Sequence, residues 1–268
     1  MNKRNVVILG TLLVAAVVGF VYWKGIYPPR TGVEGTIGAA NRYQSQQITD
    51  SDVVLKDDAV QAFLQSDTFR KIAANPEFAR LSGEAAFGKL AASEAFRKTA
   101  EMASFQEALK NSDFLSVVES NRLAEALKNA DMLALVGMKN FEALMAEAAK
   151  TNATTAEALK KIAEANRFEA IKNSEAWKSV TENAKTVEML TNVEMQRALS
   201  EAAVVQLAQS EAFRGVVGEA AFAEMAKNAD FAKIVGEAAF QEALKSNEFQ
   251  RIAEAGKISE ALTSIHTE

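Results

Sequence analysis

The sequence contains no cysteine, one histidine and only three prolines in 268 residues. Without cysteine, the chain has no disulfide, no thiol nucleophile and no thiolate ligand for zinc. A single histidine, His266, excludes a metal site built from several histidines. Thirteen glycines and three prolines are few for a loop-rich β fold. The net charge of −5 argues against a nucleic-acid partner.

One long apolar segment lies near the amino terminus. Residues 6–23, VVILGTLLVAAVVGFVYW, are eighteen uncharged residues in a row that follow the basic Lys3 and Arg4. A helix needs about 20 apolar residues to cross a bilayer, with about 17 as the lower limit. Tyr22 and Trp23 end the segment, and aromatic rings favour the membrane–water interface. The sequence therefore predicts an N-terminal transmembrane helix that anchors the chain in a lipid bilayer.

Two other interpretations of residues 6–23 stay open: a cleaved signal peptide and a buried helix of a soluble domain. Signal peptides have a shorter apolar core, about 7–15 residues, and then a cleavage site of small residues. The short basic tail favours a signal-anchor with its amino terminus inside, which places the rest of the chain outside the cytoplasm, in the periplasm or the extracellular space. We divide the chain into an anchor over 1–27, a linker over 28–52 and a repeat domain over 53–268.

From Phe69 onward, an apolar residue recurs every nine residues. Steps of nine from Phe69 to Ile258 meet 22 residues, of which 20 are apolar and 13 are among the 15 phenylalanines of the chain. We number each nine-residue unit from this residue, as position 1; positions 4 and 5 are mostly aliphatic or alanine. The predicted repeat core at position 1 comprises Phe69, Phe78, Phe87, Phe96, Phe105, Phe114, Phe141, Phe168, Trp177, Phe213, Phe222, Phe231, Phe240 and Phe249.

The spacing of positions 1, 4 and 5 is helical, but nine residues do not complete a whole number of helical turns. At about 100° per residue, one unit advances by two and a half turns, so in a continuous helix successive phenylalanines would point to opposite sides. We therefore expect a break in every unit. Asn75-Pro76, Ser112, Asn129 and Ser246 are capping residues just before position 1.

The ends of the units carry matching signals. Gly83, Gly218 and Gly236 occupy position 6, where a left-handed turn at the end of a helix favours glycine. Lys110 and Lys128 occupy the same position in other units, and a base near a helix end suits the helix dipole.

These patterns predict an all-α fold: an α-solenoid of short helices built from about 22 nine-residue repeats, preceded by the transmembrane helix. In an alternative, some breaks are missing and pairs of units fuse into helices of about 18 residues, for instance within Glu84–Lys110. The repeat weakens at Lys150 and Thr186, where position 1 is polar, but its register continues through both. We therefore place no domain boundary there.

Repetition of like residues favours a structural role, because catalysis needs a few unlike residues at one place. We predict a non-catalytic protein, with no cofactor, metal or small-molecule substrate, that acts as an envelope scaffold, spacer or self-assembling element. Its expected partners are the bilayer, through residues 6–23, and a second copy or an envelope protein. The alternative is a repeat module that binds a protein or peptide through its irregular stretch, residues 145–205, which contains Trp177, Met189 and Met195.

The predicted core can be tested by placing a charge at position 1. Phe231→Asp would bury an unpaired carboxylate and should lower the free energy of unfolding by several kcal/mol, that is, at least about 3 kcal/mol. Urea denaturation followed by circular dichroism measures this difference. An unchanged midpoint would show that position 1 does not lie in the core.

Overall fold

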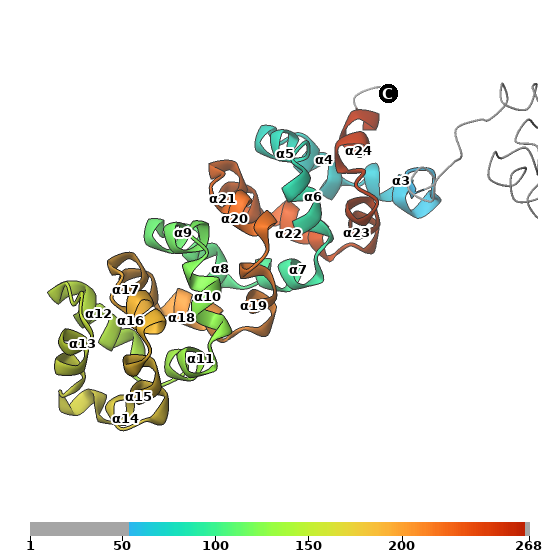
Figure 1. The fold of residues 1–268 in the computed structure, drawn as a ribbon. Helices are drawn as coiled ribbons and strands as arrows, with labels where there is room; N and C mark the ends of the chain where they lie inside the picture. The colour runs from blue at the N-terminus through green and yellow to red at the C-terminus, as the bar shows by residue number, and fades with distance from the viewer. Residues whose placement is uncertain (1–53, 266–268) are drawn as a thin grey trace, which may run out of the picture. The chain divides into compact units, whose positions relative to one another are not determined.

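Short helices follow one another along residues 54–265, the part of the chain that the computed structural model describes (Figure 1). The first arm consists of α3 (Asp58–Leu64), α4 (Asp67–Ala73), α5 (Pro76–Leu81), α6 (Ala85–Ala92), α7 (Glu94–Ala100), α8 (Ala103–Ala108), α9 (Ser112–Glu119), α10 (Arg122–Lys128) and α11 (Ala130–Val136). The apex consists of α12 (Phe141–Thr151), α13 (Ala156–Ala163), the 3-10 helix η2 (Asn166–Phe168) and α14 (Glu169–Lys172). The second arm consists of α15 (Glu175–Glu182), α16 (Ala184–Leu190), α17 (Val193–Leu199), α18 (Ala202–Gln209), α19 (Glu211–Val217), α20 (Ala220–Ala226), α21 (Ala229–Gly236), α22 (Ala238–Lys245), α23 (Asn247–Glu254) and α24 (Ile258–Ile265).

The predicted all-α class and the short helices are confirmed over the described residues. The α-helices there are four to eleven residues long. The alternative with fused helices is wrong for Glu84–Lys110, which contains the three separate helices α6, α7 and α8. Within residues 54–265, no helix is long and apolar enough to span a bilayer. The segment predicted to do so, residues 6–23, lies outside the described residues.

A regular corner is made by one residue that leaves the helical region of backbone angles. Ser93 ends α6 and starts α7 with φ −77° and ψ 121°, and its hydroxyl accepts a hydrogen bond from the amide of Phe96. Asn129 does the same between α10 and α11 for the amide of Met132. Each cap provides a partner for one of the four amides that are free at a helix start. At these corners the break is an extended residue at position 7, three residues before the next position 1, and its side chain caps the helix that follows.

The expected glycine turns are wrong. The sequence predicts left-handed turns at Gly83, Gly218 and Gly236, but Gly256 is the one described glycine with a positive φ. The extended residue at position 7 already turns the chain, so position 6 keeps right-handed helical angles, as Gly218 does with φ −90°. The other left-handed residues among those described are three asparagines, Asn121, Asn140 and Asn152.

The position of one predicted cap also needs correction. Ser112 is the first residue of α9, and the cap is Asn111, whose side-chain oxygen accepts from the amide of Phe114 at 2.9 Å. The Asn-Ser pair contained two candidate caps, and Asn111 is the one three residues before position 1.

The chain folds back on itself, so that helices far apart in the sequence lie side by side (Figure 1). α4 packs against α22, α5 against α21, α7 against α19, α9 against α17 and α11 against α15. Most first-arm helices also pack against a second partner three units further along the chain: α6 against α20 and α23, α7 against α19 and α22, α9 against α17 and α20. Within an arm, extensive packing is confined to helices adjacent in sequence.

This arrangement differs from the predicted solenoid, in which each unit would pack on its neighbours along the chain. A helix of the first arm lies between two helices of the second arm that are three units apart in sequence. We infer that each arm winds with about three units per turn and leaves a gap between its turns. The other arm, running in the opposite direction, fills that gap. The apex, where the repeat weakens, is the fold-back point, and the starting and final helices α3 and α24 lie at the opposite end of the array (Figure 1).

The capping role of position 7 predicts how a serine there changes the free energy of unfolding. Glu237 starts α22 with the same backbone angles as a capping serine, φ −76° and ψ 126°, but makes no side-chain cap hydrogen bond. Glu237→Ser should therefore raise the free energy of unfolding by about 0.5–1 kcal/mol, measured by urea denaturation. In the matched control, Ser246→Ala removes the hydroxyl that accepts from Glu248 and Phe249 and should cost about 1 kcal/mol. A loss of stability in Glu237→Ser would contradict the role of position 7.

Candidate functional site: the interface between the two arms

The residues predicted at the repeat core meet between the arms. All thirteen predicted phenylalanines are fully buried, and Trp177 keeps 3% of its exposure. The rings of the two arms alternate: Phe87 lies 5.8 Å from Phe240 between ring centroids, Phe96 lies 5.7 Å from Phe231, and Phe78 contacts Phe87 of its own arm at 5.8 Å. Aromatic pairs at these separations add to the free energy of burial. The phenylalanine ladder is therefore one shared core that neither arm can complete alone.

The two polar exceptions at position 1 lie at and next to the apex. Lys150 is exposed because α12 runs on through the usual corner to Thr151, so that position 1 of this unit faces solvent. Thr186 is buried, and its hydroxyl donates to the carbonyl of Val180 at 2.6 Å. The first exception marks the place where the chain turns back, and the second is a satisfied buried polar group.

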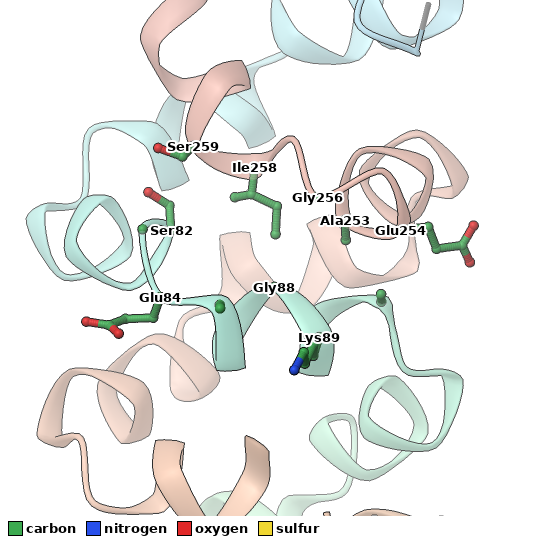
Figure 2. A pocket seen from close by; sticks show the side chains of 12 residues that line it. Ser82, Glu84, Gly88, Lys89, Ala253, Glu254, Gly256, Ile258 and Ser259 are labelled. Carbon is green, nitrogen blue, oxygen red and sulfur yellow. The ribbon is translucent and has the colours of Figure 1, made fainter. Parts of the chain in front are cut away.

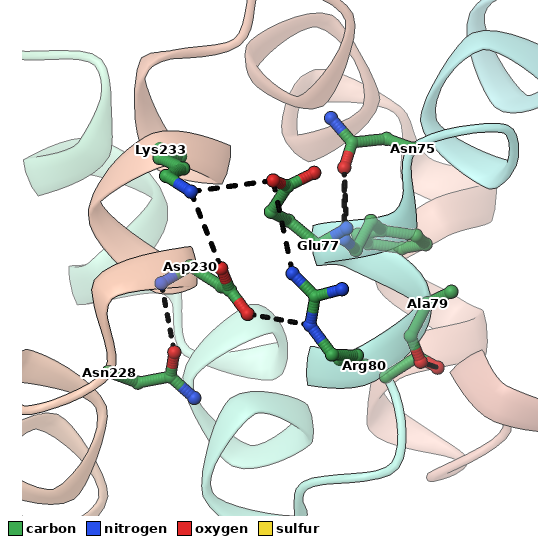
Figure 3. Close-up of polar contacts among 9 residues, drawn as sticks. Asn75, Glu77, Ala79, Arg80, Asn228, Asp230 and Lys233 are labelled. Atoms are coloured by element: carbon green, nitrogen blue, oxygen red, sulfur yellow. Dashed lines mark hydrogen bonds and ion pairs between the residues drawn. The ribbon is translucent and has the colours of Figure 1, made fainter.

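A four-residue ion-pair network joins α5 of the first arm to α21 of the second (Figure 3). Arg80 donates to Asp230 at 2.8 Å and lies 3.8 Å from Glu77, while Lys233 lies 3.5 Å from Glu77 and 3.7 Å from Asp230. Each helix contributes an acid at position 9 and a base at position 3. The network is thus nearly symmetric.

The same pairing of positions 9 and 3 recurs between other helices of the two arms. Asp113 pairs with Arg197, Glu194 accepts from the hydroxyl of Ser116, and Asp131 accepts from Ser179. In each of these pairs, and in Glu77–Lys233 and Arg80–Asp230, the two residue numbers add up to 310. These five pairs between positions 9 and 3 therefore share one antiparallel register.

α7 of the first arm packs against α19 of the second. There the partners at positions 9 and 3 are Ala95 and Gly215, and a Cβ added at Gly215 would lie 3.3 Å from that of Ala95. Two small residues at the crossing let the helix backbones approach closely. Both helices begin within the same five-residue sequence, Ser-Glu-Ala-Phe-Arg, at residues 93–97 and 210–214.

Two glutamine side chains at position 2 join a corner of the second arm to another part of the chain. The amide of Gln241 donates to the carbonyls of Val235, six residues earlier, and of Ala100, on the other arm. Gln196 donates in the same way to Leu190 and to Ala153, both at 2.7 Å. Carbonyls at helix ends have no partner inside their helix, so these amides satisfy groups that the corners leave free. Sequence reasoning missed this role; the signal is a glutamine directly after the position-1 residue, as at Gln241 and Gln196.

The irregular stretch over residues 145–205 does not place its three candidate binding residues on the surface. Trp177, Met189 and Met195 keep 3%, 9% and 0% of their exposure. These side chains belong to the core at the base of the apex. A binding surface in this stretch would therefore have to use other residues.

One surface depression of about 480 Å³ lies where α6 meets the corner between α23 and α24 (Figure 2). It exists because Gly88 stands at position 2, where no side chain fills the space. Its charged residues, Glu84, Lys89 and Glu254, point away from one another. Such a setting does not concentrate polar groups on a ligand.

Neither a metal site nor a similar known protein indicates a function for this chain. Over residues 54–265, no group of three or more acidic or histidine side chains could hold a metal ion. No protein-family model matches the sequence, and no curated protein or solved structure is significantly similar to it.

The ion-pair network predicts a pH dependence. The hydrogen bond from Arg80, helped by the nearby charges of Arg80 and Lys233, holds the pKa of Asp230 below its ordinary value of 3.8. A depressed acid pKa stabilises the fold above the ordinary value, and this stabilisation is lost as the pH falls through the folded-state pKa. Asp230→Asn should therefore be less stable than the unmodified protein at pH 6, and the gap should close below pH 3.8.

Urea denaturation at pH 6 and near pH 3 measures this gap. Glu224→Gln, at an exposed residue of α20, is the control for a general effect of removing one negative charge. A gap that stays constant over this range would contradict the assignment of the stabilisation to the ionised Asp230.

Proposed function

We propose that this protein is a membrane-anchored, non-catalytic scaffold or spacer of a cell envelope, held in the bilayer by residues 6–23 and exposed outside the cytoplasm. The observation that carries the proposal is the repeated interface between the arms. Positions 9 and 3 pair in the same way from α5 and α21 to α11 and α15 near the apex. Most of the sequence thus specifies an extended structure, as repeat proteins with structural roles do.

The connection of the chain supports the spacer part of this proposal. The predicted anchor and linker are joined covalently to the array at α3, which packs against α23 at the open end. The apex lies at the other end of the array (Figure 1). In a spacer, the two ends stay at a fixed separation, and the contacts between the arms fix the position of each helix relative to the next.

The anchor is tested by membrane fractionation of the full chain expressed in cells. We expect the protein in the membrane pellet after alkaline carbonate extraction, at its full mass, and soluble only in detergent. Leu12→Arg together with Val14→Arg should release most of it, because each arginine at the middle of a span costs about 2.5–3.5 kcal/mol.

The control for this experiment is Gly35→Arg, which adds a charge in the predicted linker and should leave the protein in the pellet. A soluble product shortened at its amino terminus would show that residues 6–23 are a cleaved signal peptide. A soluble product of full mass would exclude the anchor altogether.

A further inference from the structure

The segment that connects the two arms makes few packing contacts with them. α13, η2 and α14, residues 156–172, pack extensively only on their neighbours along the chain, α12 and α15, and on one another. The helices of the arms, in contrast, pack across the interface. Opening the apex at this segment would therefore leave the packing between the arms as the main set of contacts to be remade.

The contacts between the arms do not depend on the arms belonging to one molecule. Arg80, Glu77, Asp230 and Lys233 pair across two helices that lie on opposite sides of the apex in the sequence. The phenylalanine rings alternate between the arms in the same way. A second arm supplied by another copy of the chain can make every one of these contacts in the same register.

The position of the apolar side chains favours this surface over any other on the described part of the chain. Every valine, leucine, isoleucine, methionine, phenylalanine and tryptophan of residues 54–265 is buried or partly buried. The extensive apolar surface that residues 54–265 can offer to a second copy is therefore the surface between the arms. Exchange of an identical element between two copies reuses such a surface at little cost.

We propose that the interface between the arms is also the interface between copies: two chains open at the apex and exchange their second arms, forming a symmetric dimer. The partner is a second copy of this chain, and each half of the dimer reproduces the array of one closed molecule. The inference rests on the scaffold function proposed above, because it supplies the contact by which anchored copies join. Copies confined to one membrane meet at high effective concentration, which favours exchange during folding.

Three residues hold the apex in its closed form. The side-chain amide of Asn140 donates to the carbonyl of Arg167 at 2.8 Å, and the Arg167 guanidinium pairs with Glu147 at 3.2 Å. These contacts join the start of the apex to η2. Since they involve the connecting segment, they should be lost or rearranged when the arms are exchanged.

Cysteine pairs test the exchange, because the natural chain has no cysteine. Ala95→Cys and Gly215→Cys face each other where α7 packs against α19, near the Cβ separation of about 3.5–4.5 Å that a disulfide requires. Full-length chains with one substitution each and different tags are expressed together in the same membrane and then oxidised. In a closed molecule, the two thiols are on separate chains and cannot meet; in the exchanged dimer, they form a disulfide between chains.

We expect a reducible heterodimer at about ten times the yield of the control pair Ala95→Cys with Ala229→Cys, because only facing residues satisfy disulfide geometry. Ala229 is exposed at the start of α21, whose main partner on the first arm is α5. A chain that carries both Ala95→Cys and Gly215→Cys shows whether the disulfide forms within one molecule. If this double variant closes while the mixed pair gives no more heterodimer than the control, the exchange is excluded.

A second variant tests the apex as the hinge. Asn140→Gly keeps the left-handed backbone, φ 69°, but removes the side-chain amide that holds Arg167. It should raise the heterodimer yield severalfold, whereas the matched control Asn121→Gly, at another left-handed asparagine within the first arm, should leave it unchanged. Equal yields in the two variants would contradict opening at the apex. Membrane fractionation of the same samples tests the anchor separately, so that a failure of exchange and a failure of the scaffold proposal are distinguishable.

Discussion

The mismatch between nine residues and the turn of an α-helix governs this structure. Nine residues give two and a half turns, so an apolar residue repeated at that interval can face a single core only if the chain bends in every unit. The bend is achieved by one extended residue at position 7, such as Ser93 or Asn129, whose side chain also caps the following helix. Helices of this length are unstable alone and depend on packing for their stability.

The second consequence of the short unit is that one arm cannot bury its own core. Each arm winds with a gap between its turns, and the helices of the other arm occupy that gap, as α20 and α23 do on either side of α6. Aromatic rings from both arms therefore share the interior, and the polar pairs between positions 9 and 3 follow one register. Packing between the two arms takes the place of the stacking between neighbouring units that stabilises an ordinary solenoid.

Much of the fold could be predicted from the sequence, because the helix, its break and its buried face are local properties of nine residues. Phe231 and Asn129 could be assigned to core and cap from their spacing alone. The fold-back could not, because the register continues through Lys150 and Thr186, and pairing between units 117 residues apart, such as the two Ser-Glu-Ala-Phe-Arg words at 93–97 and 210–214, leaves no periodic signal. The role of Gln241 depends on a carbonyl of the opposite arm, which no local pattern shows.

The fixed sum of paired residue numbers limits how such a protein can change its length. Deleting one unit from the middle of an arm would shift every later residue by nine and set acids against wrong partners along part of the interface. Units added in equal number on both sides of the apex would leave all existing pairs intact. Repeat proteins of this type should therefore grow and shrink at the apex, in matched steps, while an open solenoid can gain or lose a unit anywhere along its length.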